Sequence, residues 1–301
     1  MFQEKQVPLF LLIMVVAGKR TASSNVRSPS SISMKMEVEK IKSRGLLFSF
    51  KDPFLTNVYV IIGEERVFVL DTFLGLDSMK VVKQTLVDEG CDNLPIVVFN
   101  SHGDYDHYWG NAAFNGAHII GHELCRKRVL KEHEQAIQEN VEQKKGEVIL
   151  KAPSLVFSER LSFPDDEVTF FHTPGHTVDS SSCLDDRDRV LFVGDNVETP
   201  LPYVYNADIT QFYNTSKSYL EIDWDVMIAS HAPPQFNRLL LERNIEYLDG
   251  LQNWRIDLAS LKEKELHMHL HNINFLKETI PDSARTPDME KHLKEMKNIN
   301  P

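Results

Sequence analysis

Residues 100–111 read NSHGDYDHYWGN and directly follow the apolar run 96–99, which predicts a short strand buried on both faces. Within six residues of this stretch, imidazole or carboxylate groups are carried by His102, Asp104, Asp106 and His107. Such nitrogen and oxygen donors suit zinc, iron or manganese. Carboxylates crowded this closely would repel one another unless a cation neutralised them. The stretch therefore predicts a metal site in a loop at the carboxyl end of a strand.

Further along the chain, three more predicted strands each end in a histidine or an aspartate. They are followed by His176 (after residues 168–171, within the segment PGHT), Asp195 (after 190–193) and His231 (after 226–229). One strand that ends this way is unremarkable. Several in one chain, all with metal-binding chemistry, indicate a shared metal centre.

Strand and helix patterns alternate through both halves of the chain. Strands are expected at residues 46–50, 56–62, 66–70, 96–99, 118–121, 168–172, 182–184, 190–193 and 226–229. Helices are expected at residues 75–89, 123–142, 210–221 and 237–248. This alternation predicts an α/β fold in which helices cover the β-layers.

Composition narrows the function classes. The chain has 301 residues and a formal charge of −11, and its hydrophobic content of 42% is typical of a globular protein. The acidic balance and the lack of a basic stripe argue against a nucleic-acid partner, so we expect a small-molecule substrate. The three widely spaced cysteines fit neither a disulfide scaffold nor a thiolate zinc site. The sequence leaves the oligomeric state open.

The N-terminal segment carries the longest apolar run, residues 7–17, which is shorter than the roughly 20 residues of a membrane span. No stable span is therefore expected. We expect a cytoplasmic protein, with secretion as the alternative if residues 1–24 act as a signal peptide. The expected organisation is a signal-like or disordered extension (1–36), a main domain (37–250) and a charged helical extension (251–301).

The C-terminal extension contains the sequence HMHLH, with His267, His269 and His271. A spacing of two on a helix scatters side chains over different faces. We therefore expect a solvated, charged helix here and no metal site.

Taken together, these motifs resemble the metallo-β-lactamase superfamily over residues 46–234. The family motif HxHxDH is similar to residues 102–107, and the aspartate turn at Asp71, the PGHT segment and the sequence VLFVGD at 190–195 also look like the family. The resemblance implies an αββα sandwich of two similar halves, here with added C-terminal helices. It also implies a dinuclear metal site at one edge of the sheets.

Carried over by position, the resemblance implies two sets of metal ligands. One metal would be bound by His102, Asp104 and His176. The other would be bound by Asp106, His107 and His231. Asp195 would bridge the two metals, as an aspartate does in the glyoxalase II, lactonase and nuclease branches, and Asp179 would brace the loop of His176.

Asp104 departs from the family motif, because it replaces the second histidine. A carboxylate is a harder ligand than an imidazole and shifts the preference toward iron or manganese. We expect two divalent metal ions, with zinc first and iron or manganese as alternatives. The diiron flavoprotein branch carries a glutamate at this position, so a diiron oxygen-binding or redox protein is the alternative function.

The implied function is a metal-dependent hydrolase of the metallo-β-lactamase fold. It would use a hydroxide that bridges two metals to cleave an ester, thioester, lactone, amide or phosphoester. We expect Asp106 to orient the nucleophile and to move a proton. Tyr203 or Tyr205 is expected to donate a hydrogen bond to the developing oxyanion, with packing in the loop as the alternative role.

Overall fold

The structure, a computed structural model, describes residues 35–91 and 93–297. All of them lie within one compact unit of the chain. The apolar run 7–17, and with it the expectation about the cellular compartment, lies outside the described residues. Within the described ranges, no helix is long and apolar enough to cross a membrane.

The strands of the described chain form two sheets. The first sheet has the order β1 (Met36–Ile41), β2 (Gly45–Phe50), β3 (Thr56–Ile62), β4 (Val67–Leu70), β5 (Ile96–Asn100), β6 (His118–His122) and β7 (Leu155–Phe157). The second has the order β12 (Val226–Ala229), β11 (Val190–Gly194), β10 (Ser181–Asp185), β9 (Val168–His172) and β8 (Arg160–Phe163). Strands β4 to β7 are parallel, as are β11 and β12, and the other neighbours are antiparallel.

Strand β3 shows why the central strands have nearly continuous apolar sequences. Its Val58 and Val60 pack into the core on the outer face of the first sheet, whereas Tyr59 and Ile61 pack into the core between the two sheets. Both faces of the strand are therefore buried, as expected for a strand inside a layered α/β fold.

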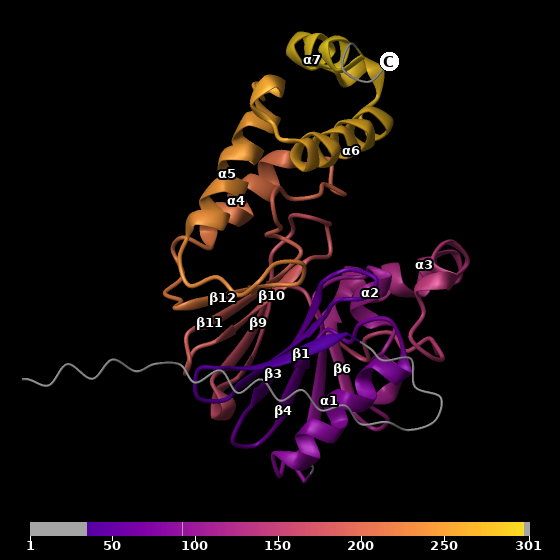
Figure 1. Ribbon diagram of the computed structural model, residues 1–301, viewed down its shortest axis with the longest axis vertical. Helices are drawn as coiled ribbons and strands as arrows, with labels where there is room; N and C mark the ends of the chain where they lie inside the picture. Colours follow the sequence, from indigo (N-terminus) through magenta and orange to yellow (C-terminus); the bar gives the residue numbers. More distant parts are fainter. Residues whose placement is uncertain (1–34, 92, 298–301) are drawn as a thin grey trace, which may run out of the picture. The chain divides into compact units, whose positions relative to one another are not determined.

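Helices cover the outer faces of both sheets. They are α1 (Leu76–Asp88) and α3 (Glu123–Glu139) on the first sheet and α5 (Leu239–Gln252) on the second. Between the sheets, the rings of Phe99 and Phe170 stack with their centroids 4.5 Å apart, a contact worth about 1 kcal/mol beyond its buried area. The layers run helix, sheet, sheet, helix (Figure 1), which confirms the predicted αββα fold.

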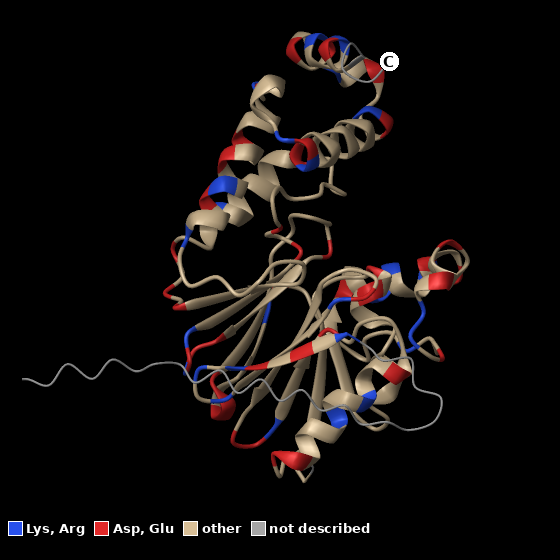
Figure 2. Cartoon of the chain, in the orientation of Figure 1, with Lys and Arg blue, Asp and Glu red and all other residues tan. Residues whose placement is uncertain are grey.

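The C-terminal helices have a hydrophobic core of their own. They comprise α4 (Ile209–Ser218), α5, α6 (Glu263–Thr279) and α7 (Pro287–Lys297). Phe212, Leu248, Leu276 and Met289 contribute one residue from each helix to this core. Acidic and basic residues are interspersed along α5, α6 and α7 (Figure 2), so the charged face of this part is mixed in sign.

Three strands were not predicted. Strand β1 lies at the edge of its sheet with mostly exposed side chains, so it lacks an apolar pattern, and β7 has only three residues. Strand β8 is four residues long and carries no fully buried side chain. Helix α3 ends at Glu139, three residues earlier than expected.

Candidate metal centre

The carboxyl ends of four strands, β5, β9, β11 and β12, meet at one edge of the sandwich and carry the predicted site. Strand β5 leads into the motif loop and then into a single helical turn, α2 (Tyr105–Tyr108). His176 lies in the loop after β9, Asp195 directly follows β11, and His231 lies just after β12. Gly194 permits the turn into Asp195, because its φ of 57° favours glycine. The folded chain therefore brings together all seven side chains predicted as metal ligands.

The first group of side chains contains His102, Asp104, His176 and Asp195, whose potential ligand atoms lie within 4.8 Å of one another. Asp104 Oδ2 is 3.1 Å from His102 Nε2 and 3.3 Å from His176 Nε2. Asp195 Oδ2 is 3.7 Å and 3.8 Å from the same two nitrogens.

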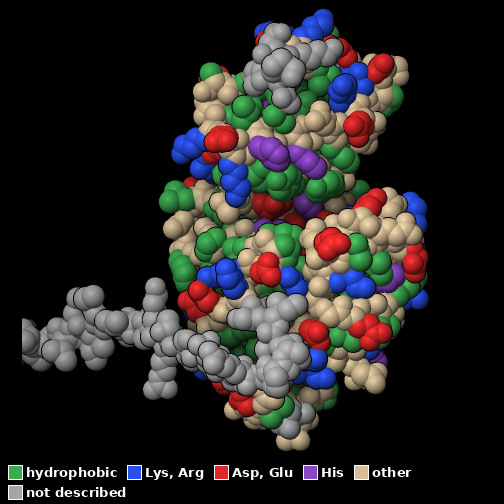
Figure 3. Space-filling model, turned by 45° about the vertical axis from the view of Figure 1, so that its right-hand side comes forward, with side chains coloured by type: hydrophobic (Ala, Val, Ile, Leu, Met, Phe, Trp, Pro, Cys, Tyr) green, Lys and Arg blue, Asp and Glu red, His purple; other side chains and the backbone are tan. Residues whose placement is uncertain are grey.

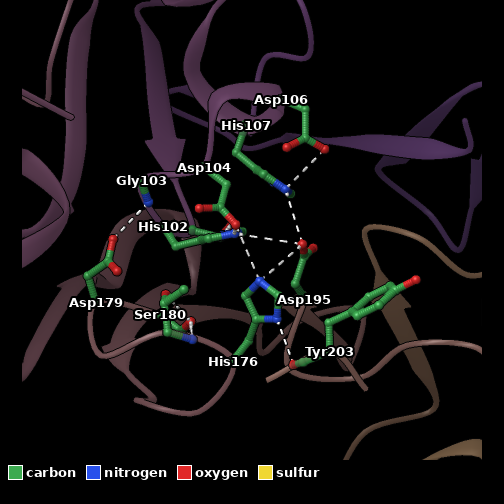
Figure 4. Close-up of polar contacts among 12 residues, drawn as sticks. His102, Gly103, Asp104, Asp106, His107, His176, Asp179, Ser180, Asp195 and Tyr203 are labelled. Carbon is green, nitrogen blue, oxygen red and sulfur yellow. Dashed lines mark hydrogen bonds and ion pairs between the residues drawn. The ribbon is translucent and has the colours of Figure 1, made fainter. Parts of the chain in front are cut away.

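The second group contains Asp106, His107 and His231. Asp106 Oδ2 lies 3.5 Å from His107 Nε2 and 3.4 Å from His231 Nε2. Asp195 Oδ2 is also 3.3 Å from His107 Nε2 and 3.2 Å from His231 Nε2. One carboxylate oxygen therefore lies among imidazoles of both groups, with His102, His107 and His176 converging on it in Figure 4.

The two histidines of the motif are oriented by contacts on their Nδ1 atoms. His107 Nδ1 lies 2.8 Å from Asp71 Oδ2, and His102 Nδ1 lies 3.0 Å from Ser101 Oγ. Asp71 also accepts hydrogen bonds from the backbone N–H and the hydroxyl of Ser101. The early aspartate turn thus holds the strand end that carries the motif, and the Nε2 atoms face the centre.

The other two histidines are held by backbone carbonyls. His176 Nδ1 donates to the Tyr203 carbonyl at 3.0 Å, and His231 Nδ1 donates to the Leu55 carbonyl at 2.6 Å. A carbonyl only accepts, so each Nδ1 carries a proton, and each Nε2 is the atom that faces the centre and would bind a cation there. This is how ligating imidazoles are oriented at metal sites.

The donor set fits divalent cations. Among the described residues, His102 Nε2, His107 Nε2 and Asp195 Oδ1 are buried without a hydrogen-bond partner. Burying such groups unpaired is costly, and cations would offset that cost. Imidazole nitrogens mixed with carboxylate oxygens suit zinc, iron or manganese.

The mutual electrostatics of the centre are strong. Burial by itself would raise the pKa of the Asp195 carboxyl, but the imidazoles of His231 and His107 hold it well below its usual range. Burial lowers the pKa of His176, but the hydrogen bond to Asp104 and the charge of Asp195 raise it to about 9. The Asp195 carboxylate thus stays ionised, which is the state in which it would bind a cation.

Arg128 on α3 is a partner of Asp104 that sequence reasoning missed. Its guanidinium pairs with Asp104 Oδ1, lies 3.4 Å from Asp179 Oδ1 and donates to Glu132 at 2.9 Å. Asp179 in turn accepts a hydrogen bond of 2.7 Å from the Gly103 N–H, so it braces the motif loop from the loop of His176. Asp104 therefore offers Oδ2 to the first group while Oδ1 is held by arginine.

Glu198 is a second missed residue. Its buried carboxylate lies 3.5 Å from His176 Nδ1 and accepts from the Tyr203 N–H at 3.1 Å. Burial and the charge of Asp195 raise the pKa of Glu198 to about 7, although the His176 imidazole lowers it. Asn244 on α5 holds the Glu198 backbone through two hydrogen bonds. In the sequence, the only sign of Glu198 is its position three residues after Asp195, the residue predicted to bridge the metals.

The two candidate tyrosines differ in how they reach the centre. Tyr203 contacts it through its carbonyl, and its hydroxyl points away from Asp195 in Figure 4. The Tyr205 ring lies edge-on to the His176 ring at 5.1 Å, and 42% of Tyr205 is exposed. The oxyanion role therefore stays a prediction, with Tyr205 as the better placed residue.

The expectation of a solvated helix around HMHLH was wrong for two of its three histidines. His269 is fully buried and hydrogen-bonded to the Tyr247 hydroxyl and to His292. His271 packs edge-on against Tyr203 at 5.0 Å and Tyr205 at 5.2 Å. One face of helix α6 lies in the core of the C-terminal helices. Its flank packs against the loop that carries Tyr203 and Tyr205, called here the tyrosine loop. The three histidines of α6 therefore lie in three different environments.

Comparison with known families identifies the chain's superfamily. The family model described as the metallo-beta-lactamase superfamily matches residues 52–262. This range contains every side chain of the two groups and ends directly before α6.

Individual proteins show more distant similarity. Acyl-coenzyme A thioesterase MBLAC2 of Bos taurus is 25% identical over 213 residues, which cover 62% of this chain and 75% of that protein. The human protein of the same name is 24% identical over 225 residues. A metallo-beta-lactamase from Pontibacter korlensis superposes with a TM-score of 0.58 at 17% identity, covering 71% of this chain and 99% of its own. One from Hirschia baltica gives 0.57 at 14% identity, covering 71% and 97%.

Proposed function

The chain belongs to the metallo-beta-lactamase superfamily and is a hydrolase of that fold, and from this premise we propose that it hydrolyses thioesters of coenzyme A with two bound divalent cations. The observation that carries the proposal is Asp195 Oδ2, which lies 3.2–3.8 Å from four imidazole Nε2 atoms belonging to two groups of side chains. The thioester substrate is proposed from the similarity to the two MBLAC2 thioesterases.

The proposed ligands are the seven side chains predicted from the sequence. The first group would hold one cation through His102, Asp104 and His176, and the second would hold another through Asp106, His107 and His231, with Asp195 shared. Bound cations would supply Lewis-acid polarisation of the carbonyl and lower the pKa of a water molecule toward neutrality.

The residues of the chain would orient and move protons around this centre. Asp106 is buried, and its Oδ2 lies within 3.5 Å of the imidazoles of His107 and His231. Its carboxylate is therefore positioned between these two rings. In hydrolysis, the hydroxyl of water bonds to the acyl carbon while the carbon–sulfur bond breaks. Asp106 would accept the proton of that water and return it to the leaving sulfur. Tyr205, beside His176, would donate a hydrogen bond to the developing oxyanion.

The test combines metal analysis with turnover. Purified protein is assayed for metals by mass spectrometry and for release of free thiol from acyl-coenzyme A, alongside ester, lactone, amide and phosphoester substrates. We expect thiol release that chelator abolishes, and loss of turnover by at least about 1,000-fold in His102→Ala and Asp195→Ala. His118→Ala, at an exposed position on the opposite end of β6, is the control. Full activity in either ligand variant would overturn the proposal.

A second candidate follows from the first group, which combines two carboxylates with two imidazoles. Such a set is harder than a histidine-rich one and favours iron. A diiron redox protein would contain two irons per chain and show an absorption band that changes on reduction. Zinc without such a band would exclude it.

A further inference from the structure

Helix α6 lies outside the matched family region yet packs against Tyr203 and Tyr205, beside the candidate centre. The family match ends at residue 262 and α6 begins at Glu263. A chain of ring contacts leads from the centre to this helix, from His176 to Tyr205 at 5.1 Å and from Tyr205 to Phe275 at 5.9 Å. Figure 3 shows histidine and hydrophobic side chains above a hollow that has acidic and histidine side chains at its base.

Asn272 fixes this helix to the tyrosine loop. Its side chain accepts from the Val204 N–H at 3.0 Å and donates to the Pro202 carbonyl at 2.8 Å and to the Tyr247 hydroxyl at 3.0 Å. The loop and α6 therefore form one rigid surface next to the first group. A preorganised surface binds a ligand without an ordering cost.

The exposed surface of this cluster is aromatic and uncharged. Burial, together with the neighbouring imidazoles of His267 and His176, lowers the pKa of His271, so its ring is neutral at neutral pH. Tyr205 and Phe275 add two more rings, whose centroids lie 5.9 Å apart. The three rings therefore carry no formal charge at neutral pH, which favours an uncharged ligand.

We propose that Tyr205, His271 and Phe275 form the acyl-binding wall of this hydrolase, which accepts the hydrocarbon chain attached to the reacting carbonyl. The inference rests on the proposed thioesterase function. The wall begins at a ring in contact with His176, so it is next to the reacting carbon. Of the two halves of an acyl-coenzyme A, only the acyl half is uncharged and free of amides, so it matches this surface.

The position of His271 allows a sharp test of the apolar character of the wall. Among the described residues, His271 Nε2 has no hydrogen-bond partner, so a phenylalanine can replace the ring without breaking a bond. His271→Phe should therefore preserve binding of a long acyl chain, and His271→Ala should weaken it.

The experiment compares acetyl- and hexadecanoyl-coenzyme A with the full chain. In Phe275→Ala and His271→Ala, KM for the hexadecanoyl substrate should rise about 10-fold, with KM for the acetyl substrate changed less than about 2-fold. His271→Phe should match the wild type. Asn274→Ala, at an exposed position of the same helix, is the matched control. Equal changes in KM for both substrates would overturn the proposed acyl-binding wall. Equal increases in KM for the hexadecanoyl substrate in His271→Phe and His271→Ala would also overturn it.

A second readout separates the wall from the thioesterase function. Binding of hexadecanoate is measured by calorimetry and needs no turnover. If the wild type cleaves no thioester but binds hexadecanoate, and Phe275→Ala weakens that binding about 10-fold, the function fails and the wall stands. If thioesters are cleaved and Phe275→Ala leaves hexadecanoate binding unchanged, the wall fails and the function stands.

Discussion

His107 Nδ1 donates a hydrogen bond to Asp71 Oδ2 across 2.8 Å, and both side chains are fully buried. Asp71 lies after β4, and His107 lies on the helical turn after β5. The pair sets the ring orientation of one proposed ligand without itself reaching the centre. Such outer partners raise the basicity of the imidazole and are nearly as important as the ligands.

Asp71→Asn should therefore weaken binding of the cation held by the second group, which contains His107, about 10–100-fold while the protein stays folded. The amide oxygen can still accept a hydrogen bond from Ser101. The amide no longer offers His107 Nδ1 a charged carboxylate oxygen as its acceptor. Competition with a chromophoric chelator measures the affinity. Asp77→Asn, at an exposed position on α1, serves as the control. Unchanged affinity in Asp71→Asn would show that the pair has no role in metal binding.

The Asp104–Arg128 pair predicts a coupled effect of two substitutions. Asp104→His restores the family motif but removes the carboxylate that lies between the Arg128 guanidinium and the first group, and leaves Arg128 with Asp179 and Glu132 only. Charge repulsion should then weaken zinc binding about 10-fold, even though imidazole is a good zinc ligand. In Asp104→His combined with Arg128→Gln, zinc binding should recover. Zinc per chain, measured after dialysis at fixed free zinc, decides the outcome, and equal zinc content in the single and double variants would contradict it.

Asn272 is predicted to be a positioning residue for His176. It holds the backbone on both sides of Tyr203, whose carbonyl accepts from His176 Nδ1. Asn272→Ala should lower kcat about 10-fold with little change in KM, and should weaken metal binding. It should also destabilise the fold by about 1–3 kcal/mol, because buried backbone groups lose partners.

The contribution of Asn272 to positioning is separable from its contribution to stability. Asn272→Asp keeps the bond from the Val204 N–H but cannot donate to the Pro202 carbonyl, so an intermediate kcat is expected. Asn274→Ala is the control on the same helix. A lower melting temperature with unchanged kcat and metal affinity in Asn272→Ala would leave Asn272 a purely structural role.

Glu198 predicts a pH dependence of stability in the chelator-treated protein. Its pKa is raised from 4.5 to about 7, so the folded state binds a proton that the unfolded state releases. The stabilisation that this proton gives to the folded state is fully present below about pH 4.5. It is lost as the pH rises through about 7, which lowers the free energy of unfolding by about 1–3 kcal/mol. Glu198→Gln should therefore melt several degrees above the wild type at pH 8 and at nearly the same temperature at pH 4.5. The same difference in melting temperature between the two proteins at both pH values would contradict this. Glu221→Gln, at an exposed position, is the control.

Strands and helices with strong local patterns were predicted well. Strands β3 and β12 have the predicted bounds, because each is an apolar run closed by turn residues. Edge strand β1 was missed, because one exposed face and charged residues leave no periodic apolar signal. The fold class was confirmed because the alternation of elements limits the layer arrangements that bury their apolar faces.

Local residue order was enough to identify the family, the αββα class and the side chains proposed as ligands. These features follow from patterns within a few residues of each strand end. Only the folded chain revealed Arg128 beside Asp104, Glu198 beside His176, and α6 beside the tyrosine loop. Pairs such as Asn272 and Pro202 are 70 positions apart in sequence, and a hydrogen bond between them depends on how whole layers pack, which no local pattern encodes.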